Sequence, residues 1–259
     1  MSSFTLYRGW LEPNRYVWSP FVVKLEARLR IAGVPYKTAS GSVQTAPKGK
    51  IPYIEISDGD NDSISSAPST IGDSTLIIKH LTERGILQDL NAGLPRPEKA
   101  HDLAVRALLE DKAYFYNTRE RWTENYYTMR DHVLSAVPYP IRIFVGLLIY
   151  RSTVQTLHGQ GAGRYSAEEI QGFREEAWGA VNDLLVASKE KAQNRGGPFW
   201  VLGGEKPTEA DTTVFGFVIS ALICEAGPKT KEFVKGLPVM REYARRIHDA
   251  YFPDYEWVE

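Results

Sequence analysis

Residues 18–36 read WSPFVVKLEARLRIAGVPY, and this stretch carries a clear local signal for one element of structure. Ser19 and Pro20 have the form of a helix N-cap followed by proline at the first helical position. Apolar residues then recur at helical spacing, and Gly33 supplies the expected stop. We therefore predict a helix that begins after Ser19 and ends at about Ala32.

Strand-like segments lie on both sides of this helix. Residues 4–10 are aromatic-rich with alternating apolar positions, which is typical of a strand. Three further strands are expected at 36–40, 51–56 and 63–71, followed by a helix at 74–83. The last strand is weak, because Pro68 favours a sheet edge or a strand end. The resulting order, β-α-β-β-β-α, predicts a compact α/β unit.

From about Pro97 onward the pattern is helical almost throughout. Helices are expected at 99–117, 122–137, 141–157, 167–192, 208–224, 229–234 and 240–251. The segment 208–224 is strongly apolar and should be the buried central helix. Residues 88–97 are rich in proline and glycine and form the natural linker. We predict one domain over residues 1–90 and a second, all-helical domain over residues 97–259.

The composition is that of an ordinary globular chain, and it excludes several classes of protein. The 259 residues include 31 Lys+Arg and 32 Asp+Glu, so the formal net charge is −1 and no global positive field exists to hold nucleic acid. The longest apolar run, residues 141–150, contains Arg142 and is too short to span a membrane. The N-terminus lacks the pattern of a secretory signal. We expect a soluble, cytoplasmic protein with no nucleic-acid partner and no transmembrane segment.

Cysteine and histidine give no sign of redox or metal chemistry. The chain has a single cysteine, Cys224, so an internal disulfide or a CxxC pair cannot form. Because Cys224 lies in the apolar segment 208–224, we expect its thiol to be buried. The five histidines are scattered without the spacing of metal ligands. We therefore predict no metal site.

Ser19 is the first candidate for chemistry. A helix N-terminus carries unpaired N–H groups and a partial positive charge, and both favour a nearby anion. A hydroxyl at this point can donate a hydrogen bond to a bound thiolate and lower its pKa. The alternative is that Ser19 is only a helix cap, and the residue pattern alone favours the cap because serine is a common N-cap residue.

Two further motifs are candidates for ligand contacts. Ile51-Pro52 begins a predicted strand, and a cis peptide bond there would turn backbone polar groups toward a ligand, although a trans bond is far commoner. Asp73 and Ser74 precede the predicted helix 74–83. The carboxylate can bind an ammonium group and the hydroxyl a carboxylate, as in an amino-acid-like ligand, or both side chains can simply cap the helix.

Two more motifs favour structural roles. Thr208-x-x-Asp211 is a capping box with Asp in place of the usual Glu, placed where the central helix should start. Trp122 and Tyr126 belong to an aromatic and polar segment that could line a pocket for a flat hydrophobic ligand. An aromatic helix face is more often part of the core.

Taken together, these motifs resemble the glutathione transferase fold, in which a thioredoxin-like β-α-β-β-β-α domain precedes an all-helical domain. Residues 18–36, 46–54 (APKGKIPYI) and 71–78 (IGDSTLII) are similar to the failed-axon-connections/metaxin-like branch of that fold. Residues 163–170 (GRYSAEEI) and 203–215 (GGEKPTEADTTVF) extend the resemblance into the helical domain. It therefore spans both predicted domains.

The resemblance implies a glutathione site in the first domain. Pro52 matches the position of the fold's cis-proline, and the backbone of Ile51 would pair with the cysteinyl part of glutathione. Asp73 and Ser74 match the acidic–serine pair that holds the γ-glutamyl end. Lys50, just before this proline motif, would meet the glycyl carboxylate.

The resemblance also implies a role for Ser19, which matches the helix-start position of serine- and cysteine-type transferases. The loop 11–18 is longer than in ordinary transferases. Tyr7 on the first strand and Tyr16 in the loop therefore stay as alternatives for the hydroxyl that meets the sulfur. Asp73 departs from the pattern as well, since it is one carbon shorter than the common Glu.

The leading hypothesis is a glutathione transferase that takes glutathione as co-substrate and conjugates its thiolate to a hydrophobic electrophile, with Ser19 as the catalytic residue. One alternative is a non-catalytic metaxin-like adaptor, peripheral to the mitochondrial outer membrane, with residues 141–150 as its docking surface. Another is a glutathione-binding ligand carrier. A homodimer is also expected, because transferases of this fold are commonly dimers.

Overall fold

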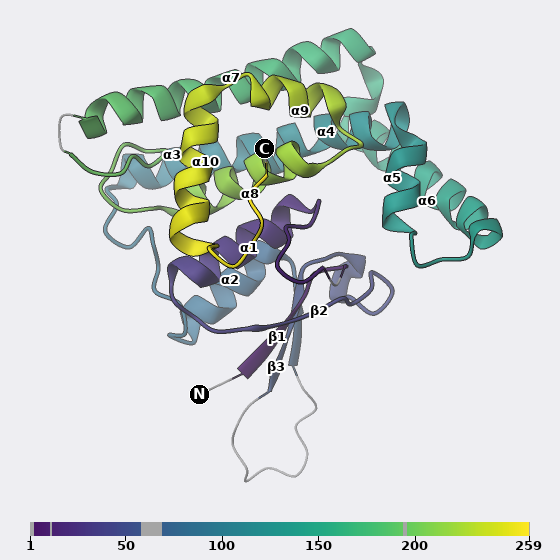
Figure 1. The fold of residues 1–259 in the computed structure, drawn as a ribbon, viewed down its shortest axis with the longest axis horizontal. Coiled ribbons are helices and arrows are strands. Elements are labelled where there is room, and N and C mark those ends of the chain that lie inside the picture. Colours follow the sequence, from purple (N-terminus) through teal and green to yellow (C-terminus); the bar gives the residue numbers. More distant parts are fainter. Residues whose placement is uncertain (1–2, 11, 58–68, 194–195, 259) are drawn as a thin grey trace.

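A computed structural model describes residues 3–10, 12–57, 69–193 and 196–258 of the chain. A four-stranded sheet lies at one end of the molecule, with α1 and α2 between it and a larger assembly of helices (Figure 1). The predicted fold class is confirmed: a thioredoxin-like sheet domain precedes an all-helical region. The division at residues 90 and 97 stays a prediction, although the first helix of the second part begins at Arg96.

The sheet contains the four predicted strands in the order β2-β1-β3-β4. Their bounds are Ser3–Tyr7, Lys37–Ala39, Tyr53–Ser57 and Ser69–Gly72 for β1 to β4. β1 runs parallel to β2 and antiparallel to β3, and β3 runs antiparallel to β4. The fourth strand is shorter than predicted at its start, and residues 63–68 of that prediction lie outside the described residues.

One face of this sheet forms a core with the two helices of the domain. Helix α1 spans Pro20–Ile31 and helix α2 spans Ser74–Glu83, in agreement with the predicted starts and stops. Leu6 and Ile54 alternate onto the buried face of the sheet and pack with Leu25 of α1 and Ile77 of α2. This packing fixes where both helices begin relative to the strand ends.

The helical region starts with a continuous helical stretch, residues 96–124, that alternates between α-helix and π-helix. Helices α3 (Arg96–Ala107) and α4 (Tyr114–Arg119) are joined by π-helical turns at 108–113, and a second π-helical segment follows at 120–124. The remaining helices are α5 (Tyr126–Val133), α6 (Tyr139–Gln160), α7 (Ala167–Gln193), α8 (Glu209–Ile223), α9 (Pro228–Lys235) and α10 (Pro238–Tyr251). The predicted helices 99–117 and 122–137 were therefore wrong in their bounds, because short π-helical turns leave no mark in the apolar periodicity.

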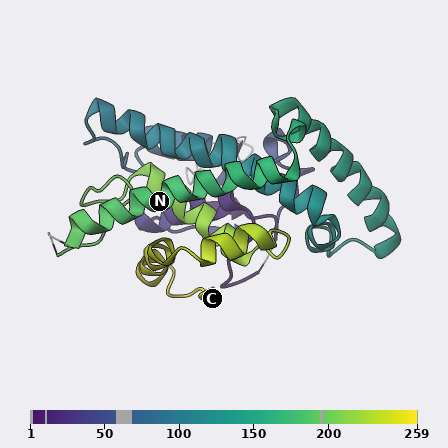
Figure 2. The ribbon, with the colours of Figure 1, turned by 90° about the horizontal axis from the view of Figure 1, so that it is seen from above.

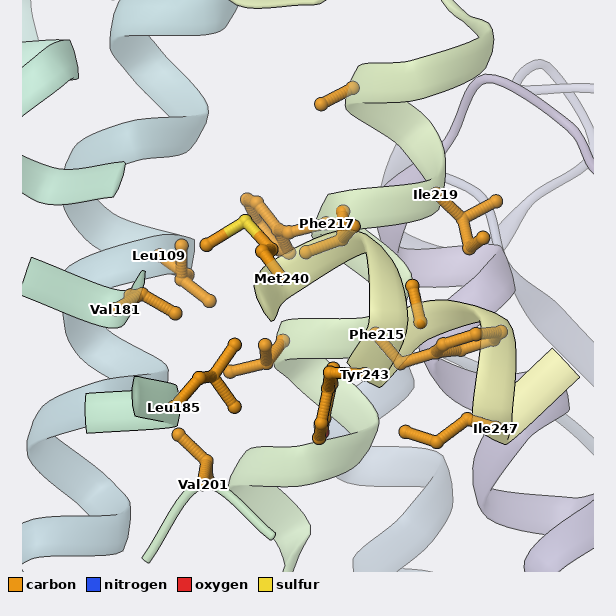
Figure 3. Packing of buried hydrophobic residues seen from close by; sticks show 14 of the residues in the cluster. Leu109, Val181, Leu185, Val201, Phe215, Phe217, Ile219, Met240, Tyr243 and Ile247 are labelled. Carbon is orange, nitrogen blue, oxygen red and sulfur yellow. The ribbon is translucent and has the colours of Figure 1, made fainter. Parts of the chain in front are cut away.

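The predicted central helix is confirmed as α8, which is buried along nearly its whole length. Its Phe215 and Phe217 pack among residues of α7 and α10 such as Leu185 and Tyr243 (Figure 3). Cys224, at its end, is fully buried as expected.

Helices α8 and α1 approach each other at Gly216. A Cβ atom at Gly216 would lie 2.6 Å from the carbonyl oxygen of Pro20 and 2.7 Å from the backbone nitrogen of Lys24. The first turn of α1 is therefore seated directly on the central helix of the second region. This contact places the N-terminus of α1 where both parts of the protein meet.

Helices α5 and α6 lie at one end of the helical region, beyond the bundle formed by α7 to α10 (Figures 1 and 2). The open question of whether residues 141–150 are core or surface is answered by α6, because most of its large apolar side chains are exposed. Within the described ranges, no single helix is long and apolar enough to cross a bilayer. Helices α8 and α9 have the required length and hydropathy only when taken together, and this pair is bent by 116°.

Candidate functional site

Ser19 lies at the N-terminus of α1, as predicted. Its side-chain oxygen accepts a hydrogen bond from the backbone N–H of Val22 at 3.4 Å, so the capping role is confirmed. The distance is long for an N–H···O bond, and the side chain is half-buried. Among the described residues no acceptor for the Ser19 hydroxyl proton is present, so the hydroxyl can donate to a group that binds in front of the helix.

The residue before Ser19 is held by the helical region. The backbone carbonyl of Trp18 accepts hydrogen bonds from Ser220 Oγ of α8 at 2.5 Å and from Arg121 Nη1 at 3.3 Å. Arg121 also donates to Ser220 Oγ at 3.2 Å. The start of α1 is thereby fixed by side chains that lie about 100 and 200 residues further along the chain.

The predicted ligand motifs at 51–52 and 73–74 are brought together by the sheet. The Ile51–Pro52 peptide bond is cis, and the carbonyl oxygen of Pro52 accepts a hydrogen bond from Asp73 N at 3.3 Å. Asp73 caps α2 by accepting from the backbone nitrogens of Thr75 and Leu76 at 3.0 and 3.2 Å. It does so with φ 80°, a conformation that a non-glycine residue rarely adopts and that is often associated with functional sites.

Burial differs among the predicted glutathione-binding residues. Asp73 and Lys50 are exposed, and Ile51 is half-buried. Ser74 is buried with 3% of its surface accessible, so its hydroxyl offers little surface to a ligand in this conformation. The N–H groups of Thr75 and Leu76 both donate to one oxygen of Asp73, so the second carboxylate oxygen of Asp73 is the more accessible polar group there.

Two contacts connect these motifs to α1 and to the loop after β1. Lys24 Nζ of α1 donates to Thr75 Oγ1 in the first turn of α2 at 3.1 Å. A Cβ at Gly9 would lie 2.3 Å from Ile51 Cδ1, so the loop after β1 rests directly on Ile51. These contacts therefore join α1 to the first turn of α2, and the loop after β1 to the residue before the cis proline.

An aromatic cluster that the sequence did not indicate lies beside the start of α1. The ring of His132, from α5, stacks on Trp18 with centroids 3.6 Å apart and an interplanar angle of 11°. Trp10 also lies against this imidazole, with ring centroids 5.3 Å apart. All three side chains are half-buried. Burial lowers the pKa of His132 below its ordinary value of 6.5, partly offset by the nearby Glu12 carboxylate, so the imidazole is neutral at pH 7.

The two alternative hydroxyls are occupied elsewhere. The Tyr7 hydroxyl donates to Glu55 Oε2 at 3.1 Å, and the Tyr7 ring stacks on Tyr53 with centroids 4.3 Å apart. Both tyrosines line a cavity of about 320 Å³ on the face of the sheet that α1 and α2 do not cover. Tyr16 is buried, and its hydroxyl lies 2.8 Å from His248 Nδ1. Ser19 is the hydroxyl, of these three candidates, that lies at the start of α1.

The two predicted hydrophobic-pocket residues lie just before α5 and at its start, and α5 is the helix that carries His132. Trp122 is buried within the π-helical segment 120–124. Tyr126 lies on α5 and packs against Tyr150 of α6 with ring centroids 5.3 Å apart. In the part of the chain that is described, no group of three or more His, Cys, Asp or Glu side chains could hold a metal ion.

The fold combines a thioredoxin-like domain that contains a cis-proline with a helical region whose central helix starts with a capping box. This combination is typical of glutathione transferases, and comparisons with known sequences indicate the same class. The family described as "Glutathione S-transferase N-terminal domain" matches residues 20–129. The chain is 30% identical over 175 residues to the isoprene-epoxide–glutathione S-transferase of Rhodococcus sp. (strain AD45), covering 64% of this chain and 69% of the relative. The chain belongs to the glutathione S-transferase superfamily.

Solved structures support the same fold. A glutathione transferase family member from Pseudomonas fluorescens Pf-5, with two glutathione molecules bound, aligns with a TM-score of 0.55 at 16% identity over 97% of this chain and 92% of that one. Glutathione transferase GSTFuA2 from Phanerochaete chrysosporium aligns with a TM-score of 0.56 at 16% identity over 96% of this chain and 98% of that one. At these identities the likeness concerns the fold.

Proposed function

We propose that this protein is a glutathione transferase that conjugates glutathione to a small hydrophobic electrophile, with Ser19 stabilising the glutathione thiolate. The observation that carries the proposal is that the start of α2 contacts both the cis Ile51–Pro52 turn, through Asp73, and helix α1, through Lys24. Membership of the superfamily and the relative in Rhodococcus support it.

Glutathione would lie along these segments. The backbone of Ile51, next to Pro52, pairs with the cysteinyl part of the tripeptide. Asp73 receives the γ-glutamyl ammonium group, and the backbone N–H of Ser74, at the start of α2, holds its carboxylate. Lys50 is exposed beside the turn and meets the glycyl carboxylate. This orientation directs the sulfur toward the start of α1.

The chemistry then follows from the start of α1. The thiol loses its proton to solvent, and the thiolate is stabilised by the Ser19 hydroxyl and the partial positive charge of the helix N-terminus. The thiolate attacks the electrophilic carbon. With an epoxide, the class named for the Rhodococcus relative, a C–S bond forms, one C–O bond of the ring breaks and the alkoxide takes a proton from water.

The electrophile would bind against Trp10, Trp18 and His132, because this cluster adjoins Ser19 and presents half-buried aromatic faces. Trp122 and Tyr126 stay proposals for the same pocket, although the burial of Trp122 and the packing of Tyr126 on α6 leave them less surface to offer.

Calorimetric titration with glutathione tests the binding site. Asp73→Ala should abolish or strongly weaken binding, because a charge-assisted contact to the ligand is lost. Asp89→Ala is the matched control: Asp89 is also exposed and also caps a local turn, accepting from Asn91 N at 2.8 Å, but it lies outside the three segments. Equal affinity in the wild type and Asp73→Ala would overturn the proposed site.

The alternative hypotheses share the fold and differ in turnover. A metaxin-like adaptor, peripheral to the mitochondrial outer membrane, would bind a partner without conjugating anything, and a ligand carrier would bind glutathione without transferring it. Our proposal places the protein in the cytoplasm. Product formation from glutathione and a panel of small epoxides separates it from both alternatives, since neither predicts any conjugate.

A further inference from the structure

The chain enters helix α1 through residues 12–18, and the last residues of the chain contact this loop. The backbone N–H of Glu256 donates to the carbonyl oxygen of Asn14 at 3.1 Å, and Arg15 Nε lies 3.1 Å from the carboxylate of the same glutamate. We call residues 252–258 the C-terminal segment. Arg15 and Glu256 are 241 positions apart, so two distant parts of the chain meet just before the start of α1 (Figure 1).

Tyr16 anchors this loop to the helical region. Its hydroxyl lies 2.8 Å from Nδ1 of His248 on α10. Its ring packs against Phe215 of α8 and against Phe252 and Tyr255 of the C-terminal segment, with centroids 5.0–6.1 Å apart. All five side chains are buried. Burial raises the pKa of Tyr16 and lowers the pKa of His248, so at pH 7 a neutral phenol donates to a neutral imidazole.

The C-terminal segment is itself fixed to α1. The Tyr255 hydroxyl donates to Glu26 Oε1 at 2.8 Å, and Asp254 forms an ion pair with Arg30. The Arg30 guanidinium also lies over the rings of Phe252 and Tyr255, 4.4 and 4.5 Å from their centroids. Because Glu26 and Arg30 both belong to α1, the segment that supports Tyr16 is tied to the helix that Ser19 caps.

The direction in which the chain reaches Ser19 depends on two anchors. The carbonyl oxygen of Trp18, directly before Ser19, accepts hydrogen bonds from Ser220 and Arg121. A single anchored point lets the backbone pivot, whereas a second point restricts its φ and ψ angles. Tyr16, three residues before Ser19, is that second point. The rotamer of an N-cap side chain depends on these angles, so a loosened Tyr16 would turn the Ser19 hydroxyl.

We propose that Tyr16 is a positioning residue that, held by His248 and the C-terminal segment, aims the Ser19 hydroxyl at the ligand. Tyr16 acts through Ser19, because its own side chain is 5% exposed and its hydroxyl is already bonded. The inference rests on the proposed function, in which the Ser19 hydroxyl stabilises the glutathione thiolate.

Steady-state kinetics of Tyr16→Phe tests this role. The variant keeps the ring and removes the hydroxyl bond to His248, so kcat should fall about 3- to 10-fold while the calorimetric Kd for glutathione stays within about twofold. Tyr243→Phe is the matched control, because its buried hydroxyl donates at 2.8 Å to Asp211 of α8 rather than holding the loop 12–18. The control should lose stability in urea and keep its kcat.

A thiol in place of the Ser19 hydroxyl gives a readout that needs no glutathione. Cys224 is fully buried, so Ser19→Cys introduces the accessible thiol, and the pH dependence of its alkylation by iodoacetamide gives its pKa. A helix N-terminus lowers a thiol pKa below the ordinary value of about 8.5. Adding Tyr16→Phe should raise the pKa of the introduced thiol toward that value, whereas adding Tyr243→Phe should leave it unchanged.

Circular dichroism verifies that each variant is folded. If Tyr16→Phe does not fold, Asp254→Asn carries the same two tests, because the Asp254 side chain is 49% exposed and its change weakens the ion pair that fixes the C-terminal segment to Arg30.

Two results would overturn the inference: an introduced thiol with the same pKa with and without Tyr16→Phe, or an equal fall of kcat in Tyr16→Phe and Tyr243→Phe. A wild type that forms no conjugate, together with a thiol pKa that rises when Tyr16→Phe is added, would contradict the proposed function and support the positioning role.

Discussion

Helices α1 and α8 both begin with a hydroxyl residue, pack against each other, and differ in how completely their N-termini are satisfied. At α8, Asp211 is fully buried and accepts hydrogen bonds at 2.8 Å from Thr208 N, Val201 N and the Tyr243 hydroxyl. At α1, Ser19 is half-buried and accepts a single, long bond from Val22 N.

The difference distinguishes a structural helix start from one that is open to a ligand. At α8, every polar group of the capping box has a partner inside the protein, which leaves nothing to offer to a ligand. At α1, the Ser19 hydroxyl proton has no acceptor among the described residues, and its oxygen makes one long capping bond at the positive end of the helix. The comparison predicts that changes at α8 affect folding, whereas changes at Ser19 affect chemistry.

The largest effect on stability is expected for Asp211→Ala. The variant leaves the buried N–H groups of Val201 and Thr208 and the hydroxyl of Tyr243 without an acceptor, at about 1–3 kcal/mol for each group. We expect the free energy of unfolding to fall by about 3 kcal/mol or more, measured by urea denaturation. A loss below about 1 kcal/mol, the effect of an ordinary cap, would contradict this account of the α8 start.

Gly216→Ala should have the next largest effect, because it alters the contact between the two helices. The new methyl group would meet the backbone of Pro20 and Lys24 at under 3 Å, and overpacking of this kind costs about 1–3 kcal/mol. Gly172→Ala in α7 is the control, since nothing lies within 4 Å of its Cβ position and a helical alanine there should stabilise the protein. Thermal denaturation that ranks Gly216→Ala at or above Gly172→Ala in stability would show that α1 can move away from α8 at no cost.

Ser19→Ala should change stability little and activity strongly. Loss of an N-cap costs about 1 kcal/mol, whereas loss of a hydrogen bond to a charged thiolate should lower kcat/KM about 10- to 100-fold. Ser19→Gly separates the two roles, because glycine is an acceptable N-cap but has no hydroxyl. Steady-state kinetics should show the same loss of activity in both variants and a smaller loss of stability in the glycine variant.

The smallest effect is expected from the titration of His132 beside this helix start. Because burial lowers the pKa of His132 in the folded state, the unfolded chain binds more protons just below pH 6.5. The contribution of the neutral His132 to the stability of the fold is complete above pH 6.5 and is lost as the pH falls through the folded-state pKa. The melting temperature of the wild type should therefore drop more between pH 7.5 and pH 5.5 than that of His132→Gln. The difference between the two proteins isolates this site from His248, whose pKa is also lowered by burial. If the melting temperatures of the wild type and His132→Gln fell by the same amount over this pH range, burial would not lower the pKa of His132.

Local signals in the sequence were sufficient to predict much of the fold. The Ser19-Pro20 cap, the Gly33 stop and the Thr208–Asp211 box each act through groups a few residues apart, and each was confirmed. The alternating strands and the apolar segment of α8 were likewise visible as periodicity. The Ile51–Pro52 cis bond could be expected only from the resemblance to the superfamily, because residue pattern alone favours trans.

The features that the sequence did not reveal depend on long-range contacts. His132 reaches Trp18 through the placement of α5, and Tyr16 becomes buried because its loop packs on the end of α10. Neither contact leaves a spacing signal. The exposure of α6 was also undetermined, because an apolar run has the same composition whether it is covered by its own chain or by another.

The same limit applies to the buried ion pairs between the two parts of the protein. Lys24 of α1 pairs with Glu110 at 2.6 Å, and Arg28 pairs with Glu209 at 2.7 Å. Charges spaced along α1 would be expected to face solvent in a helix on its own. They are buried here because the second region supplies acidic partners from distant positions in the chain.

The pKa of the bound glutathione thiol tests the central claim most directly. It is measured by following the ultraviolet absorbance of the thiolate against pH in the complex with the wild type and with Ser19→Ala. We predict a thiol pKa in the wild-type complex well below the value of about 8.5 for an ordinary cysteine thiol, and a clear rise toward that value in Ser19→Ala. A thiol that titrates identically in both complexes would show that the open start of α1 does not activate glutathione.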